Sequence, residues 1–351
     1  MLNPIVDKAR PSLEAMLNES IDGPERVVVE ALLTGSIEQV RALALDGGLV
    51  SNGLRQVAWP FLMSDTLLNG EAKPVSRDEK AEIETFKQIE LDVPRSVDPP
   101  HREQLETFLK AFFTKHKDLC FYQGFADLAW AVLRIMTDGV TCKETGEAAA
   151  HFVLTRLSRF TYLRDAHRAT FEGIFAYLPA VDAIIERQDK QLGQLWREAS
   201  ANQYWAISPL LCMFSHDIKD TARIGRILDA IIAQERVLEF PIYLVAALPM
   251  LPRVRTRILE VEMEACQVHE TMLEAIRDPM NVEDLINAAL RLQERVPSKF
   301  VVKTAMAAGL PSDSCLAQYF QSEASGIAMS KKRSWRTFSF FSQTLEVGIF
   351  Q

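Results

Sequence analysis

The feature that most constrains this chain is the helical spacing of its apolar residues, which recurs over most of its length. Ile83, Phe86 and Ile89 follow each other at intervals of three, and Leu128, Val132 and Met136 at intervals of four. Such spacing places side chains on one face of an α-helix, whereas a half-buried strand alternates every second residue. No region is dominated by strand-type alternation. We therefore predict an all-α protein built from many helices.

The composition limits the classes of partner and site. The chain has 351 residues, 48% of them hydrophobic, enough for one large or two ordinary domains. Its net charge of −8 argues against a nucleic-acid partner, which requires a basic surface. Five widely spaced cysteines indicate a reducing compartment, and the six histidines lack the spacing of metal ligands. The longest apolar run, 240–251, contains two prolines, so we expect no transmembrane segment.

One candidate site residue follows a proline at the end of a predicted helix. Ser76 and Glu79 have the spacing of a capping box, which predicts a helix start. Pro94 lacks an N–H group, so the helix should end just before it and Arg95 should lie on the following loop. Asp92 could hold the Arg95 guanidinium through two hydrogen bonds. An ordinary surface ion pair remains the alternative.

A second candidate lies in the segment Phe121-Tyr122-Gln123-Gly124. Gly124 separates an aromatic pair from a new run of apolar residues at helical spacing. Gln123 should therefore lie at the start of a helix, near its positive end. The alternative is an amide buried in a turn, where it satisfies backbone groups.

Taken together and in this order, the two segments resemble the TBC domain of Rab GTPase-activating proteins, and the compact early-secretory branch in particular. The motifs are Ile-x-x-Asp-x-x-Arg and aromatic-x-Gln-Gly, and the matching residues are Ile89, Asp92, Arg95, Phe121, Gln123 and Gly124. Phe121 stands where the family has a tyrosine, and Tyr122 follows it. Arg55, four residues before Trp59, resembles the arginine near the start of the family's domains.

The resemblance implies two helical subdomains with a groove for the GTPase. It implies that Arg95 and Gln123 are catalytic fingers, and it gives supporting roles to Asp92, Arg55, Phe121, Tyr122 and Gly124. The expected organisation is a helical extension over 1–44, the TBC domain over 45–300 and a partly disordered tail over 301–351. Basic and aromatic residues within 331–341 are typical either of a segment at an anionic membrane surface or of a disordered terminus.

The function that the resemblance implies is acceleration of GTP hydrolysis by a Rab. The protein itself would neither bind nor hydrolyse GTP, and no phosphate-binding Gly-rich motif occurs in its sequence. GTP and Mg²⁺ would be carried by the Rab, and the protein would need no cofactor or metal of its own. We expect it in the cytoplasm, recruited through the Rab to endomembranes such as the ER or Golgi. The alternatives are a non-catalytic scaffold that binds a small GTPase, and a metal-independent hydrolase.

Overall fold

The structure is a computed structural model whose described residues form helices and connecting loops. All regular elements in this part of the chain are helical, without a single β-strand, which confirms the predicted all-α class. The described residues are 4–18, 21, 23–64, 79–140, 142–198, 203–234, 239–260, 265–277 and 281–324.

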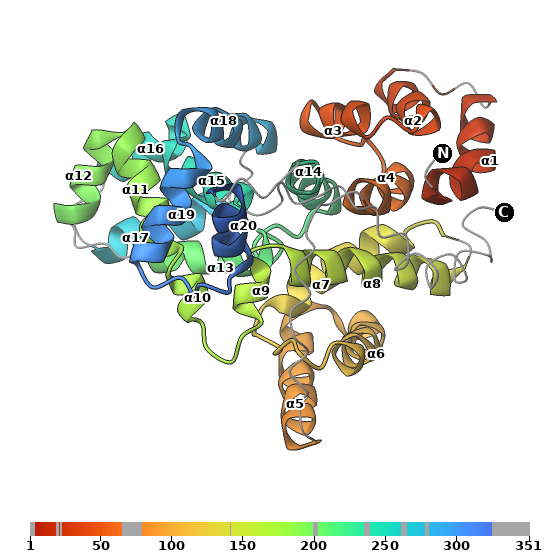
Figure 1. Ribbon diagram of the computed structural model, residues 1–351, viewed down its shortest axis with the longest axis horizontal. Coiled ribbons are helices and arrows are strands. Elements are labelled where there is room, and N and C mark those ends of the chain that lie inside the picture. Colours follow the sequence, from red (N-terminus) through yellow and green to blue (C-terminus); the bar gives the residue numbers. More distant parts are fainter. Residues whose placement is uncertain are drawn as a thin grey trace.

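The helices form two groups, which lie on the right and left of Figure 1. The first group consists of α1 (Pro4–Asn18), α2 (Pro24–Thr34), α3 (Ile37–Leu45), α4 (Asn52–Ser64), α5 (Glu79–Ser96), α6 (Pro99–Lys115), α7 (Phe125–Thr137) and α8 (Lys143–Phe160). The second consists of α11 (Leu178–Gln188), α12 (Lys190–Glu198), α15 (Phe240–Ala247), α16 (Pro252–Glu260), α17 (Ala265–Arg277), α18 (Val282–Arg295), α19 (Ser298–Ala307) and α20 (Cys315–Ala324).

Shorter elements and one long helix connect the two groups. These are α9 (Leu163–Ala166), α10 (Glu172–Phe175), the 3₁₀ helices η1 (Gln203–Ala206) and η2 (Leu248–Met250), α13 (Ile207–Cys212) and α14 (Thr221–Ile232). Helix α14 packs against α4 and α7 on one side and against α18 on the other. The two groups agree with the predicted pair of helical subdomains, whereas the groove for a GTPase stays a prediction.

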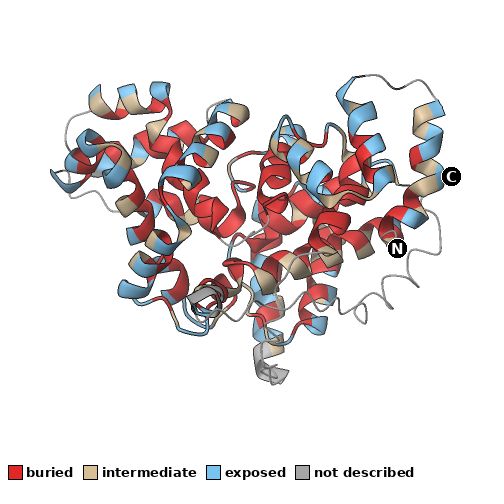
Figure 2. Cartoon of the chain, turned by 45° about the horizontal axis from the view of Figure 1, so that its top comes forward, coloured by how far each residue is buried: buried red, intermediate tan, exposed pale blue. Residues whose placement is uncertain are grey.

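The core follows the apolar faces read from the sequence. Buried residues line the inward side of most helices and exposed residues their outer side (Figure 2). Helix α15 is buried on every side, as its uninterrupted apolar sequence requires. Trp59 in α4 is fully buried.

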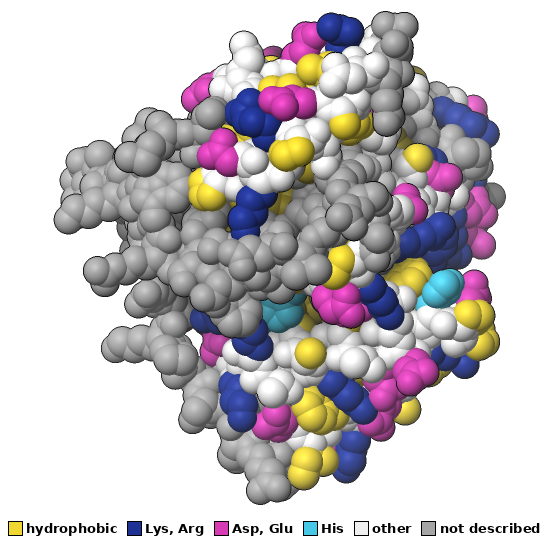
Figure 3. All heavy atoms as spheres, turned by 90° about the vertical axis from the view of Figure 1, so that its right-hand side faces the viewer, with side chains coloured by type: hydrophobic (Ala, Val, Ile, Leu, Met, Phe, Trp, Pro, Cys, Tyr) yellow, Lys and Arg dark blue, Asp and Glu magenta, His cyan; other side chains and the backbone are white. Residues whose placement is uncertain are grey.

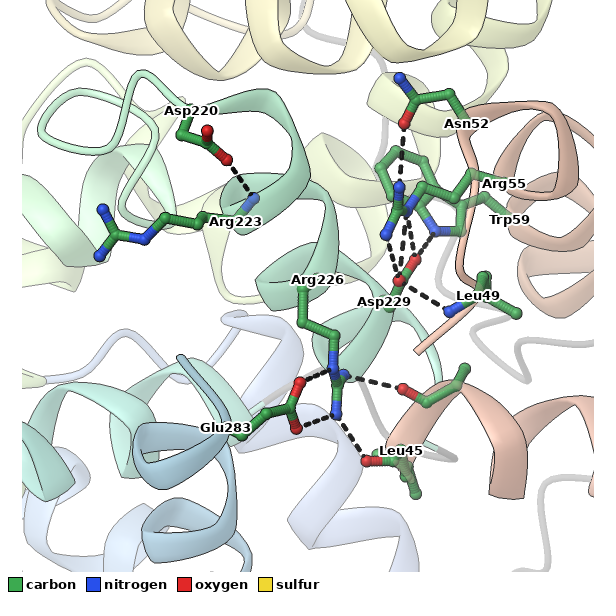
Figure 4. Close-up of polar contacts among 11 residues, drawn as sticks. Leu45, Leu49, Asn52, Arg55, Trp59, Asp220, Arg223, Arg226, Asp229 and Glu283 are labelled. Atoms are coloured by element: carbon green, nitrogen blue, oxygen red, sulfur yellow. Dashed lines mark hydrogen bonds and ion pairs between the residues drawn. The ribbon is translucent and has the colours of Figure 1, made fainter. Parts of the chain in front are cut away.

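Arg226 on α14 joins three helices (Figure 4). It donates to both carboxylate oxygens of Glu283 on α18, at 2.6 and 2.9 Å. It also donates to the carbonyl oxygens of Ala44 and Leu45 at the end of α3. Carbonyl groups in the last turn of a helix lack partners within the helix, and a cation there is favourable. Arg226 therefore ties the N-terminal helices to both α14 and the second group.

The first part of the predicted tail is packed against the second group. Val301, Val302 and Ala305 are buried in α19, which lies against α11. Leu316 and Ala317 of α20 are buried as well. This corrects the expectation of a tail from residue 301. Many apolar residues in this segment are alanines, which weaken the hydrophobic pattern. The basic and aromatic cluster at 331–341 lies outside the described residues.

The visible surface mixes charges of both signs. Figure 3 shows acidic and basic side chains interspersed on the face at the right-hand side of Figure 1, with small apolar areas between them. Such a surface is typical of solvated helical faces. Within the described residues, none of the helices combines the length and hydrophobicity needed to cross a bilayer.

Candidate functional site

Arg95 lies in the last turn of α5, and its side chain is exposed. The prediction that the helix ends before Pro94 is wrong, because α5 continues through the proline to Ser96. The missing proline N–H leaves only the carbonyl of Glu90 without its partner, and Glu90 is exposed. Buried Val93 and Val97 lie on either side of Pro94 and hold the turn against the core. Arg95 is thus presented on a helix and not on a loop.

Gln123 is exposed on a tight turn directly before α7. The residue that follows it, Gly124, precedes the first helical residue and has φ 94°, in the left-handed region. A Cβ atom at this position would meet the Cys212 sulfur at 2.8 Å, so a larger residue would be both strained and crowded. The position of Gln123 beside the helix start agrees with the prediction. Its exposure is incompatible with the alternative of a buried amide.

The carboxylate of Asp92 connects the two candidate elements. It accepts a hydrogen bond of 2.9 Å from the backbone N–H of Gly124, and its side chain is only 5% exposed. Burial raises the pKa of Asp92 above its ordinary value, although the Gly124 N–H acts in the opposite direction. The turn that carries Gln123 is therefore attached to the helix that carries Arg95.

The predicted grip of Asp92 on the Arg95 guanidinium is not present. Asp92 is buried and Arg95 is exposed, and although the charge of Arg95 acts to lower the pKa of Asp92, no ion pair or hydrogen bond joins the two side chains. Among the described residues, Arg95 has neither an ion pair nor a side-chain hydrogen bond. Asp92 therefore positions the backbone of the turn and leaves the guanidinium open to a partner.

The aromatic pair before Gln123 anchors the turn on both sides. The Tyr122 hydroxyl donates to the carbonyl oxygen of Leu211 on α13 at 2.8 Å. Phe121 packs edge-on against Phe113 of α6, with ring centroids 5.5 Å apart. Phe121 lacks the hydroxyl of the family's tyrosine. The adjacent Tyr122 carries a hydroxyl, and this group reaches the buried carbonyl of Leu211.

His167, which follows α9, fixes the residue before this pair. The backbone N–H of Cys120 donates to the His167 carbonyl at 2.9 Å, and the His167 Nδ1 donates to the Cys120 carbonyl at 2.8 Å. The His167 ring also lies 4.9 Å from the Tyr122 ring. Reasoning from the sequence missed His167, since nothing near it in the chain indicates a contact 47 residues away.

Asp127, in the first turn of α7, is a second buried carboxylate near the site. It accepts hydrogen bonds from His216 Nδ1 at 2.9 Å and from Lys219 Nζ at 2.8 Å. Although burial favours its neutral form, these two bonds hold the pKa of Asp127 below its ordinary value. The hydrogen bond between His216 and Asp127 also raises the pKa of His216. Asp127 and Lys219 were not identified from the sequence.

Arg55 lies in a separate buried cluster between α4 and α14 (Figure 4). Its guanidinium pairs with the Asp229 carboxylate at 2.9 Å. The same carboxylate accepts hydrogen bonds from the Trp59 indole at 2.8 Å and from the Leu49 backbone N–H at 3.0 Å. This cluster joins α4 of the first helical group to the connecting helix α14 and, within the described structure, contacts neither Arg95 nor Gln123. The predicted support of the site by Arg55 is at most indirect.

The arrangement presents a guanidinium and an amide to solvent from two elements joined by one hydrogen bond. A guanidinium can neutralise charge on a phosphoryl group, and an amide can orient a water molecule. No group of three or more His, Cys, Asp or Glu side chains in the described residues could hold a metal ion. An exposed guanidinium and an exposed amide suit action on a group that a partner brings.

Comparison with known proteins agrees with this geometry. The sequence is 26% identical over 281 residues to TBC1 domain family member 20 of Mus musculus, covering 76% of this chain and 66% of that protein. It is 26% identical over 213 residues to the GTPase-activating protein gyp10 of Schizosaccharomyces pombe, covering 58% of this chain and 54% of the relative. The matches thus span less than two thirds of these relatives.

A solved structure has the same fold. The crystal structure of the Ypt/Rab-GAP domain of Gyp1p superposes with a TM-score of 0.58, covering 84% of this chain and 99% of that domain at 16% sequence identity. The sequence model of the Rab-GTPase-TBC domain matches residues 52–259, which is more than half of the chain. These findings confirm the resemblance seen in the two motifs, and the chain belongs to the Rab-GTPase-TBC domain family.

Proposed function

We propose that this protein accelerates GTP hydrolysis by a Rab-type small GTPase and supplies Arg95 and Gln123 to the partner's active site. The observation that carries the proposal is the pair of exposed fingers on two elements that are joined by the hydrogen bond from the Gly124 N–H to the Asp92 carboxylate. Family membership and the relatives named as GTPase-activating proteins support it. GTP and Mg²⁺ come with the partner, and the protein needs no cofactor of its own.

Arg95 stabilises the charge that develops during transfer of the phosphoryl group. Its guanidinium has no ion-pair partner among the described residues, so no ion pair within the described structure has to break when a GTPase docks. An arginine supplied in this way contributes about 10³–10⁵ to the rate of hydrolysis.

Gln123 orients the attacking water in place of the GTPase's own glutamine. The amide is exposed, and the adjacent backbone is fixed by Asp92 and by the Tyr122 hydroxyl. A pre-positioned amide loses little conformational freedom on binding, which favours the transition state. The Rab would bring the complex to its own endomembrane, where the protein would act peripherally.

The test is single-turnover hydrolysis by a panel of GTP-loaded Rab proteins. For the Rab that responds most strongly, Arg95→Ala should lower the rate by about two to four orders of magnitude. Arg95→Lys should also fail, because an ammonium lacks the planar fork. Arg134→Ala is the matched control, since Arg134 is also exposed in the last turn of a helix. The melting temperature should barely change in these variants.

A second arm tests the glutamine. Wild-type protein should still accelerate a Rab whose own catalytic glutamine is replaced by alanine, and Gln123→Ala should abolish that effect. If Gln123→Ala is harmless with the normal Rab, and acceleration vanishes with the altered Rab, the protein supplies only one finger. If Arg95→Ala accelerates like wild type, Arg95 is not a catalytic finger. If wild-type protein binds a Rab without accelerating its hydrolysis, the protein is a non-catalytic scaffold for the GTPase. Without a Rab, the protein should not hydrolyse GTP.

A further inference from the structure

Two exposed aromatic rings lie beside the turn that carries Gln123. Phe171 lies just before α10 and Phe175 at its end. They are 39% and 48% exposed, and their ring centroids are 6.4 Å apart. The Phe171 ring is also edge-on to the Tyr122 ring at 6.4 Å. Large exposed apolar groups that adjoin one another mark interaction surfaces more often than single ones do.

The base of these rings is tightly packed. Gly173 lies between Phe171 and Phe175 in the sequence. A Cβ atom at Gly173 would lie 2.7 Å from the Cβ of Asp165, so α10 packs directly against α9. Asp165 accepts hydrogen bonds from the Tyr177 hydroxyl at 2.6 Å and from Arg168 at 2.9 Å. Helix α10 also packs against α13, which carries the carbonyl bonded by Tyr122. The rings are therefore exposed on a fixed support.

Helix α5 has a comparable apolar side chain next to the other finger. Leu91 is 60% exposed and precedes Arg95 by four residues, so both project from one face of the helix. Ile83, on the same helix, is 50% exposed. Neither finger is thus surrounded only by polar residues.

We propose that Leu91, Phe171 and Phe175, here called the apolar rim, form docking contacts for the GTPase and so place its bound nucleotide against the fingers. This inference rests on the function proposed above. Leu91 lies one helical turn from Arg95, and Phe171 packs on Tyr122, the residue before Gln123, so a partner that receives both fingers will lie over the rim. Aromatic anchors on rigid supports contribute most to interfaces, because little freedom is lost when they are buried. Rim residues determine affinity for the GTPase, whereas the fingers determine the chemical rate.

The experiment separates KM from kcat for the Rab that wild-type protein accelerates most. Phe171→Ser with Phe175→Ser, and separately Leu91→Ser, should raise KM by about tenfold, the effect of losing one anchor. The kcat at saturating Rab should stay within about twofold of wild type. Phe175→Ser alone isolates docking, because Phe175 does not contact Tyr122 within the described structure. The control is Val27→Ser on α2, at the opposite end of the molecule in Figure 1, where an equally exposed side chain (47%) should be dispensable.

Conservative replacements test whether the change in KM comes from lost apolar surface and not from a folding defect. Phe171→Leu with Phe175→Leu keeps the apolar surface and should restore most of the affinity, and circular dichroism should show equal melting temperatures. If the serine variants leave KM unchanged while Arg95→Ala abolishes acceleration, the rim is not the docking contact and the proposed function stands. A fall in kcat at constant KM would overturn the docking role. If wild-type protein accelerates no Rab, both proposals fail.

Discussion

Replacing Asp92 by alanine tests whether one hydrogen bond keeps the two fingers in register. The Asp92 carboxylate is the bridge from α5 to the turn of Gln123, and it accepts the Gly124 N–H at 2.9 Å. Alanine would leave that N–H buried without an acceptor, because Gly124 is itself buried. Both the stability of the fold and the position of Gln123 should then suffer.

The magnitudes follow from the environment of the bond. A buried donor left without an acceptor costs about 1–3 kcal/mol. Burial raises the pKa of Asp92, which shows that the charged carboxylate is itself costly there, so its removal offsets part of the loss. We expect the free energy of unfolding to fall by about 1–2 kcal/mol. The hydrolysis rate should fall about 100-fold, because a displacement of about 1 Å at a catalytic group has effects of this size.

Asparagine separates the hydrogen bond from the charge. Asp92→Asn keeps an acceptor oxygen, and a neutral bond still contributes about 0.5–1.5 kcal/mol, so its rate should stay within about tenfold of wild type. The assays are urea unfolding and single-turnover hydrolysis by the responsive Rab. Asp189→Ala is the control, because Asp189 also accepts a backbone N–H, from Leu192 at 3.1 Å, but lies between α11 and α12 in the second helical group, where it also pairs with Arg255.

Two results would refute this reasoning. If Asp92→Ala loses stability as Asp189→Ala does but hydrolyses at the wild-type rate, the bond serves folding alone. If Asp92→Asn is as inactive as Asp92→Ala, the negative charge matters and the acceptor does not. The expected pattern is a stability loss in both alanine variants and a rate loss in Asp92→Ala only.

Two other predictions concern stability. Burial, with a smaller contribution from Glu186, raises the pKa of Asp182 to about 7, above the unfolded value of 3.8. The neutral form is therefore favoured in the folded state, and this stability is lost as the pH rises from about 4 through 7. Asp182→Asn should gain stability over wild type by pH 8 but not at pH 4, as measured by urea unfolding, and an equal pH dependence would contradict this. Deleting 306–351 removes buried Leu310 and Leu316, each contributing about 1.5–3 kcal/mol, so the melting temperature should fall clearly. Deleting only 325–351 is the control, and equal melting temperatures for the two deletions would show that α20 is dispensable.

Patterns within short stretches of sequence predicted the helices and singled out Arg95 and Gln123 as candidates, and both side chains are exposed in the structure. Apolar periodicity is a local property, and the motifs that single out Arg95 and Gln123 each consist of a few neighbouring residues. Local rules failed at Pro94, where they predicted a helix end. The rule counts the lost N–H bond, but the burial of Val93 and Val97 on either side of the proline outweighs it.

The partners of the polar side chains could not be predicted, because they depend on contacts between distant segments. Tyr122 reaches a carbonyl 89 residues further along the chain, and Asp127 reaches His216 across the same separation. Asp92 was expected to bind its neighbour Arg95 and instead binds Gly124, 32 residues away. A single sequence gives each carboxylate several plausible partners, and only the packing of α5, α7 and α13 selects one.

These distant contacts converge on one turn. Helix α13 holds the residue before Gln123 through the Tyr122 hydroxyl, and its Cys212 sulfur leaves no room for a side chain at Gly124. Asp92 holds the same turn from the opposite side through the Gly124 N–H. Because α10 also packs on α13, the aromatic rings near the site share this support. A shift of α13 would therefore move Gln123 and the rings together relative to Arg95, so substitutions far from the fingers in sequence should change catalysis whenever they displace this helix.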